Sequence, residues 1–315
     1  MLKSTKFVDL LDAPYSRRGS FLAFANDNYG EDLYGKCNLW LCSSRIAMSA
    51  MADLYANNGF RKLKLQLVKN GKPLPSVIST TPYEVILQSR YGEVRFAFGE
   101  TKLIEAYGKD GLTLRASINK PFIFLAEPEP VTPPAPVASA VIDFNTSKLL
   151  LAPIEGTLAQ GSEYTEISPD ANGVIRLALQ DFFVGEPKVR ASYPSYDECV
   201  ASVKADFDEY CEQICPKLPA EFEPGRLQAL WQNWSMTVTP DGESAYKRRM
   251  VKMIHSIFEG AFVWQQPLQA IVHARNPEIA WDIYCSGFEH MGEDGKMTDS
   301  LTFKDEPSMG LKPPV

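Results

Sequence analysis

The sequence predicts a β + α multidomain protein, with an antiparallel β-sandwich at residues 1–190 and an α-helical segment at residues 191–315. Three observations predict this class. Lys62–Val68 alternates apolar and polar residues with a period of two, and the tight-turn pair Asn70-Gly71 follows it closely. Glycines divide the first part of the chain into short strand-like runs, as they do in sandwiches. After Tyr193 the apolar residues recur at helical spacing instead.

The predicted strands of the sandwich are apolar or alternating runs separated by turn residues. They are Phe21–Ala25, Lys62–Val68, Tyr83–Leu87, Glu93–Phe98, Leu112–Ala116, Phe122–Leu125, Val141–Phe144, Lys148–Leu151 and Val174–Leu179. The proline-rich stretch Glu127–Pro136 favours an extended conformation. Because strand-like text resumes after it, we interpret this stretch as a long surface loop within the sandwich.

The predicted helices follow from apolar residues three and four positions apart and from typical start and stop residues. Pro194-Ser195 starts the first helix, and Pro216 ends it. The further predicted helices are Phe222–Val238, Tyr246–Phe258, Pro267–His273 and Pro277–Phe288. The basic run Lys247–Arg249 is interpreted as a solvated face of the third helix.

Composition and charge exclude several classes of function. The net charge of -7 argues against nucleic-acid binding, which needs a clustered basic field. With three histidines and no Cys-x-x-Cys pair, the sequence predicts no metal site and no cofactor. No run is apolar and long enough for a signal peptide or a membrane span. We therefore expect a cytoplasmic protein with reduced thiols and no membrane partner.

Four short motifs follow one another in the last part of the chain. They are Ile257–Gln265 (IFEGAFVWQ), Asn276–Ala280 (NPEIA), Asp294–Asp299 (DGKMTD) and Lys312–Pro314 (KPP). In this order and spacing they resemble the mannosylglycerate-hydrolase-like group of bacterial glycosidases, close to glycoside hydrolase family 63 and more distantly to the trehalases. In that family a β-sandwich precedes an (α/α)6 toroid. The resemblance implies the N-terminal portion of an inverting, exo-acting α-glycosidase with the first helical hairpins of the toroid.

The resemblance also implies a substrate-binding set of Trp264, Gln265, Asp299 and Lys312, with a carbohydrate as partner. Trp264 would form one wall of the sugar pocket, and Gln265 replaces a family aspartate that holds a sugar hydroxyl. Simpler interpretations stay open for each residue. Trp264 fits a buried position at a helix entrance equally well, and Gln265 fits a helix start. Asp299 fits a solvated cap, and Lys312 an exposed position near the terminus.

Hydrolysis by inversion needs two carboxyl groups about 6.5–9.5 Å apart. In the family the acid follows the Lys-Pro-Pro motif and the base lies later still, so we expect both beyond residue 315 and assign no catalytic residue. The nearest carboxylates show no catalytic pattern: Glu259, Asp282, Glu289, Glu293, Asp294 and Asp299. An incomplete toroid should leave apolar helix faces exposed, for self-association or for pairing with another chain.

Two alternatives belong to other classes of function. The chain could be a non-enzymatic carbohydrate-binding or assembly subunit that uses the sandwich, with sugar platforms drawn from Tyr29, Tyr34, Trp40, Tyr55 and Tyr91. Such rings in strands are usually core residues. In the third interpretation the helical resemblance is accidental, and a two-domain protein of unknown role remains.

Overall fold

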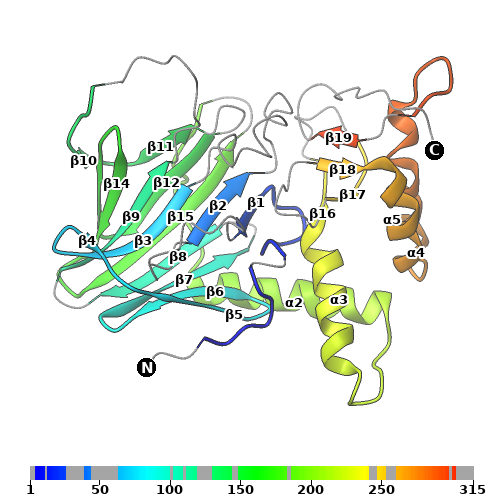
Figure 1. Cartoon of the computed structure of the whole chain (residues 1–315), viewed down its shortest axis with the longest axis horizontal. Helices are drawn as coiled ribbons and strands as arrows, with labels where there is room; N and C mark the ends of the chain where they lie inside the picture. The colour runs from blue at the N-terminus through cyan, green and yellow to red at the C-terminus, as the bar shows by residue number, and fades with distance from the viewer. Residues whose placement is uncertain are drawn as a thin grey trace.

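The computed structural model describes most of the chain. The described residues are 4–10, 13–25, 39–43, 63–99, 102–108, 111–118, 130–143, 148–182, 186–240, 247–252, 260–297 and 300–302. Two antiparallel sheets make up its first part, and helices with short two-stranded sheets make up the rest (Figure 1). This confirms a β-rich N-terminal region that is followed by a few helices.

Both large sheets are built from antiparallel neighbours joined by hydrogen bonds. The first has the order β1 (Leu22–Ala25), β2 (Leu39–Ser43), β3 (Leu63–Lys69), β9 (Leu112–Ile118), β14 (Tyr164–Ser168), β13 (Thr157–Gln160) and β10 (Ala135–Val137), with β4 (Lys72–Pro73) paired to β3. The second has the order β11 (Ala140–Asp143), β12 (Lys148–Glu155), β15 (Val174–Phe182), β8 (Lys102–Gly108), β7 (Gly92–Phe98), β6 (Glu84–Ser89) and β5 (Val77–Thr80).

The alternating run after residue 62 forms β3, as its period predicted. Leu63, Leu65 and Leu67 are buried in one core cluster that draws on both sheets. Asn70 and Gly71 turn the chain into β4, and both have positive φ, of 51° and 75°. A turn with two positive φ angles matches the twist of the strands it joins, which is why Asn-Gly is favoured there.

The first two described helices pack on the sandwich. α2 (Tyr196–Ile214) begins at Ser195, whose side chain accepts a hydrogen bond from the backbone N–H of Glu198 while the Glu198 carboxylate accepts from the Ser195 N–H. It lies against β7 and β8. α3 (Glu223–Met236) adds Trp231 and Trp234 to the core cluster of the sandwich, so these two helices extend that core.

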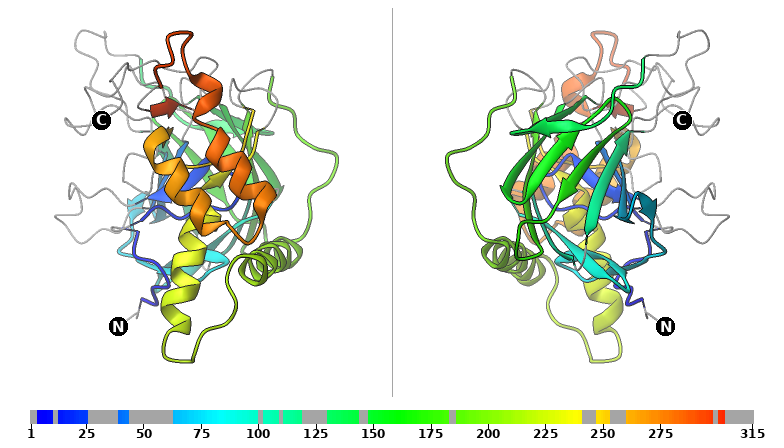
Figure 2. Two further views of the ribbon diagram at one scale, coloured as in Figure 1. Left: turned by 90° about the vertical axis from the view of Figure 1, so that its right-hand side faces the viewer. Right: turned by 90° about the vertical axis from the view of Figure 1, so that its left-hand side faces the viewer.

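The remaining elements follow α3 and form a layer that packs on Phe21 and on Ala23 of β1. They are β16 (Thr237–Val238), β17 (Met250–Val251), β18 (Gly260–Phe262), the 3-10 turn η2 (Val263–Gln265), α4 (Gln266–Val272), α5 (Pro277–Cys285), η3 (Phe288–His290) and β19 (Ser300–Thr302). β16 pairs with β17, and β18 pairs with β19. α4 and α5 lie side by side at the edge of the molecule (Figure 2).

Three helix predictions need correction. The helix predicted at Phe222–Val238 ends at Met236, because Thr237 and Val238 form β16. The helix predicted at Tyr246–Phe258 is wrong for its described part, because Met250 and Val251 form β17 instead. Its apolar residues bury themselves by pairing with β16, and sequence spacing does not reveal such a distant partner. The last helix ends at Cys285, and Phe288 lies in η3. No helix of the described part is long and apolar enough to span a membrane.

Candidate functional site

The loop between β18 and α4 carries Trp264, and it leaves the indole exposed. Of the Trp264 side chain and backbone surface, 59% is accessible, and the ring stacks on Phe262 with centroids 5.9 Å apart. The interpretation of Trp264 as a buried residue at a helix entrance is therefore wrong. An indole that is exposed and held by a second ring offers an open apolar face, the surface that a pyranose ring packs against.

Gln265 and its neighbour Gln266 have different environments. Gln265 is partly exposed and stands at the N-cap of α4, as the helix-start interpretation predicted, with no side-chain capping bond. Gln266 is fully buried. Its side-chain amide accepts from the Val251 N–H at 3.0 Å and donates to the Val251 carbonyl at 3.0 Å and the Phe262 carbonyl at 3.2 Å. It thereby pairs with Val251 as a strand backbone would, and it fixes the loop that carries Trp264.

Of the other predicted site residues, Asp299 and Lys312 lie outside the described residues. The strand that begins directly after Asp299 is β19, and its Ser300 lies opposite Phe262 of β18. The backbone therefore brings the segment after the acidic-glycine turn beside the strand that leads to Trp264. The other two described motifs occupy α5, with Asn276 as its N-cap, and the turn at Gly292–Gly295.

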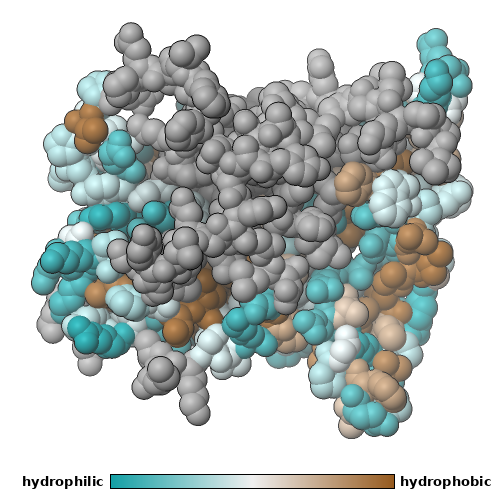
Figure 3. Space-filling view, viewed as in Figure 1, coloured by the Kyte–Doolittle hydropathy of each residue, from teal (hydrophilic) through white to brown (hydrophobic). Residues whose placement is uncertain are grey.

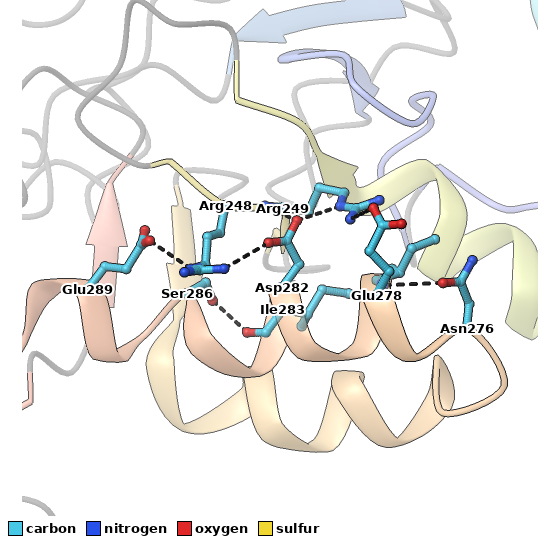
Figure 4. A network of polar contacts seen from close by, with 9 residues as sticks. Arg248, Arg249, Asn276, Glu278, Asp282, Ile283, Ser286 and Glu289 are labelled. Carbon is cyan, nitrogen blue, oxygen red and sulfur yellow. Dashed lines mark hydrogen bonds and ion pairs between the residues drawn. The ribbon is translucent and has the colours of Figure 1, made fainter.

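An ion-pair network binds α5 to the segment before β17 (Figure 4). Arg248 contacts Glu289 at 2.7 Å and Asp282 at 3.2 Å, and Arg249 contacts Asp282 at 2.6 Å and Glu278 at 2.8 Å. Burial lowers the pKa of Arg249, but the hydrogen bonds and charges of these two carboxylates outweigh it and raise the pKa above its ordinary value. The basic run is thus engaged with α5 rather than forming a solvated helix face.

The same network explains why no carboxylate pair in this region is free for acid–base chemistry. Asp282 and Glu289 are held by the two arginines, and Asp294 pairs with Lys296 at 2.6 Å. These three carboxylates of the described residues are engaged by basic side chains, and we assign no catalytic pair from them.

A cavity of about 300 Å³ lies where α2, α4 and α5 approach one another. Arg18 and Arg249 line it together with the buried Tyr210 and His273. Nδ1 of His273 is 2.8 Å from the Gln269 carbonyl, which can only accept, so Nδ1 carries the proton and Nε2 accepts from the Tyr210 hydroxyl at 2.8 Å. Burial lowers the pKa of His273, and both arginines lower it further. The Tyr210–His273 pair fixes α4 against α2.

A second cavity, of about 430 Å³, lies between the end of α2 and the start of α3. Its lining includes Cys211 and Cys215, which are free thiols. Burial raises the pKa of Cys211 to about 11, so that thiol stays protonated and is a poor nucleophile at neutral pH. Within the described residues, no three His, Cys, Asp or Glu side chains are grouped to hold a metal ion.

The sugar platforms proposed for the sandwich find little support in their described members. Trp40 is only 6% exposed. Tyr91 is partly buried, and the cationic groups of Lys69 and Arg90 lie 4.2 and 4.5 Å from its ring centroid. A cation over an aromatic ring competes with a sugar for that face. Tyr29, Tyr34 and Tyr55 lie outside the described residues.

The fold is similar to that of an inverting mannosidase of glycoside hydrolase family 92 from Bacteroides thetaiotaomicron. The TM-score is 0.58 over 99% of this chain, and the sequence identity is 8%, so the likeness concerns the fold alone. The chain spans 51% of the length of that mannosidase chain. A YidC insertase aligns over 55% of the chain with a TM-score of 0.22, which is too low to indicate a shared fold.

Neither the models of protein families nor the curated protein sequences give a match to this chain. The structural comparison therefore supports a glycosidase-like fold in general. It does not support the specific family 63-like group that the sequence motifs resemble, and it does not establish an (α/α)6 toroid.

Proposed function

We propose that this chain is the N-terminal portion of an inverting, exo-acting α-glycosidase. In this proposal residues 1–190 form a β-sandwich domain, and residues 191–315 supply the first helical hairpins of an (α/α)6 toroid of the mannosylglycerate-hydrolase-like type. The main support is the glycosidase-like fold, which extends over 99% of the chain. The ordered motifs between Ile257 and Pro314 give an independent reason from the sequence. The cytoplasmic location that the sequence predicts is part of the proposal.

Trp264 is the residue through which the chain would contact the sugar. Its exposed ring stacks on Phe262, and the buried Gln266 amide bonds to the backbone of Val251 and Phe262 and so positions the loop that carries it. A fixed aromatic face binds a pyranose with little loss of side-chain entropy. Gln265 lies beside it and can donate and accept hydrogen bonds from sugar hydroxyls. Asp299 and Lys312 complete the proposed substrate-binding set through the family resemblance.

The reaction class requires a carboxylic acid and a carboxylate on opposite sides of the scissile bond. We assign neither to the described residues, because Asp282, Glu289 and Asp294 are engaged by basic side chains. In the proposal these two groups come from the part of the toroid that the present chain does not supply. The role of this chain is then to shape and orient the sugar pocket.

The test compares this chain with a form extended by whatever coding sequence follows Val315. Both are assayed against aryl α-glycosides and α-linked disaccharides. We expect turnover by the longer form alone, and we expect Trp264→Ala to lower its kcat/KM about tenfold or more. Phe222→Ala, at a residue that is equally exposed but lies at the start of α3, should leave activity unchanged. Turnover by the 315-residue chain would show that the catalytic carboxylates lie within it and that the proposal is wrong.

A second candidate function is an assembly subunit without catalysis. One observation favours it: α4 and α5 carry large apolar side chains on their outer side, which is typical of an interaction surface. Absence of turnover in both forms, together with a stable complex between this chain and another polypeptide, would favour this candidate.

A further inference from the structure

The outer side of α4 and α5 carries exposed apolar side chains, and we call this surface the α4–α5 outer face. Six residues form it: Leu268, Ile271, Val272, Trp281, Tyr284 and Phe288. Ile271 is 70% exposed and Trp281 is 63% exposed, and the other four are also classed among the exposed large apolar side chains. In the space-filling view apolar side chains gather on the right-hand edge, over these two helices (Figure 3). Exposure of this extent is unusual for a face that stays in water.

α5 is apolar on two sides. Ile279 and Ile283 point inward and pack in a small cluster with Met236 and Val251. Trp281 and Tyr284 lie on the outer side of the same helix. A helix that is apolar around most of its circumference is normally covered on both sides. The inner layer covers one side of α5, and the residues of the outer side indicate a second layer.

The outer face has the chemistry of a helix-packing surface. Trp281 stacks on Tyr284 with centroids 5.8 Å apart, and Tyr284 contacts Phe288 at 5.3 Å. The neighbouring helix α4 carries exposed aliphatic side chains, Leu268 and Ile271 among them. A sugar site pairs an aromatic ring with groups that bind hydroxyls, whereas aliphatic neighbours supply none. The combination therefore favours apolar side chains of another polypeptide over a carbohydrate.

Charge points to the same kind of partner. The acidic residues of α5, Glu278 and Asp282, are engaged by Arg248 and Arg249 at the flank of the helix, and Glu289 is engaged in the same way. The six residues of the outer face carry no charge. A charged partner surface would lose its hydration here without gaining an ion pair. The face thus fits helices whose contact side is also uncharged.

We propose that the α4–α5 outer face is the docking surface for a further layer of apolar-faced helices, supplied by the polypeptide that completes the toroid. This inference rests on the proposed function, and it names the partner and the surface that the partner uses. The structural comparison supports the choice of occupant, since this chain matches 51% of the mannosidase chain and the remainder of that chain has no counterpart here. The proposal concerns the contact between the two helical layers, and it holds whether the partner layer is covalently joined to this chain or is a separate polypeptide.

The test is a binding titration between two separately produced polypeptides. One is the 315-residue chain, and the probe is the product of whatever coding sequence follows Val315, made as a separate polypeptide. Complex formation and stoichiometry are measured by light scattering after gel filtration, and Kd by fluorescence anisotropy. We expect a one-to-one complex, and we expect Leu268→Glu and Trp281→Glu each to weaken Kd by about 30-fold or more.

A matched control separates loss of this surface from a general effect of added charge. Phe222 at the start of α3 is 58% exposed, as is Leu268, and it lies outside the outer face. Phe222→Glu should therefore leave Kd unchanged. All three sites are exposed, so the variants should keep the wild-type Tm and circular dichroism. If Leu268→Glu or Trp281→Glu does not keep the wild-type Tm, the lysine substitution at the same position takes its place in the titration.

Three results would overturn the proposal. The first is binding that is equal in the wild type, Leu268→Glu and Trp281→Glu. The second is a dimer of this chain that needs Trp281 and excludes the probe, since a second copy would then be the occupant. The third is binding of an α-linked oligosaccharide that Trp281→Glu abolishes. Turnover tests the proposed function separately. If the complex forms and needs Leu268 and Trp281 but shows no turnover, this inference stands and the proposed function fails. If the complex turns over substrate and every variant binds equally well, the proposed function stands and this inference fails.

Discussion

The sandwich and the α4–α5 pair differ in how they are held together. The sandwich has apolar side chains from both sheets, from α2 and from α3 in one buried cluster. The α4–α5 pair shares a small cluster with β17 on its inner side and is attached mainly by directed polar contacts. These are the Gln266 amide, the Tyr210–His273 hydrogen bond and the arginine network. Apolar burial gives the sandwich its stability, whereas polar contacts set the position of the pair.

The sharpest test of this comparison replaces one tryptophan in each region. Trp234 is fully buried, and its indole N–H donates to Asp206 at 2.8 Å, while Trp281 lies on the outer face. Trp234→Ala should lower the free energy of unfolding by about 3–5 kcal/mol because it opens a cavity in the core. Trp281→Ala should change it by no more than about 0.5 kcal/mol. Urea unfolding of both variants measures the difference, and equal losses would contradict the comparison.

The Gln266 amide tests whether polar contacts position the Trp264 loop. Gln266→Leu keeps a side chain of similar size and leaves the Val251 N–H and two carbonyls without their buried partner. We expect a loss of about 2 kcal/mol in the free energy of unfolding. We also expect the emission maximum of Trp264 to shift as its loop loosens. The Trp264 signal is obtained by subtracting the spectrum of the matching Trp264→Phe protein. Gln265→Leu is the control, since the Gln265 side chain caps no helix. An unchanged Gln266→Leu protein would show that the amide is dispensable.

The two helix caps test whether the regions unfold together. Ser195 caps α2, and Asn276 caps α5, where it accepts from the Ile279 N–H at 3.3 Å. Each replacement by alanine removes a cap that contributes about 1 kcal/mol. Ser195→Ala should lower the stability of the whole sandwich, while Asn276→Ala should speed hydrogen exchange in α4 and α5 only. Exchange that speeds up throughout the chain in Asn276→Ala would show a single cooperative unit.

The smallest effect concerns pH. The unfolded chain protonates His273 near its ordinary pKa of 6.5, but the buried ring, facing Arg18 and Arg249, has a lower pKa and is protonated only at lower pH. The unfolded state therefore binds more protons below that value, so the contribution of His273 to stability is lost as pH falls below 6.5. We expect Tm to fall less between about pH 7.5 and pH 5.5 in His273→Gln than in the wild type. A steeper fall in the variant would contradict the lowered pKa.

Local patterns predicted the elements that depend on neighbours in the sequence. The alternation around Leu65 gave β3, and Pro194-Ser195 marked the start of α2. The helix expected at Tyr246–Phe258 failed in its described part because Val251 has distant partners, β16 and Gln266. Spacing along the chain does not report such partners.

The candidate site shows the same limit. The sequence left Trp264 open between a buried and an exposed position, since an aromatic residue before a proline-containing helix fits both. In the structure Trp264 is exposed. The arginine network had one indication in the sequence: Glu278 and Asp282 are four residues apart on a helix, which places them on one side where a basic run can meet them. Gln266 gave none.

The pairing of β18 with β19 has a consequence for synthesis on the ribosome. The strand that precedes Trp264 ends at Phe262, and its partner begins only at Ser300. At translation rates of roughly 5–20 residues per second, β18 waits about 2–8 s for that partner. During this time its backbone edge is open to pairing with other nascent chains. Slower decoding between these strands should therefore lower the yield of native protein, whereas chaperone capture of this segment should raise it.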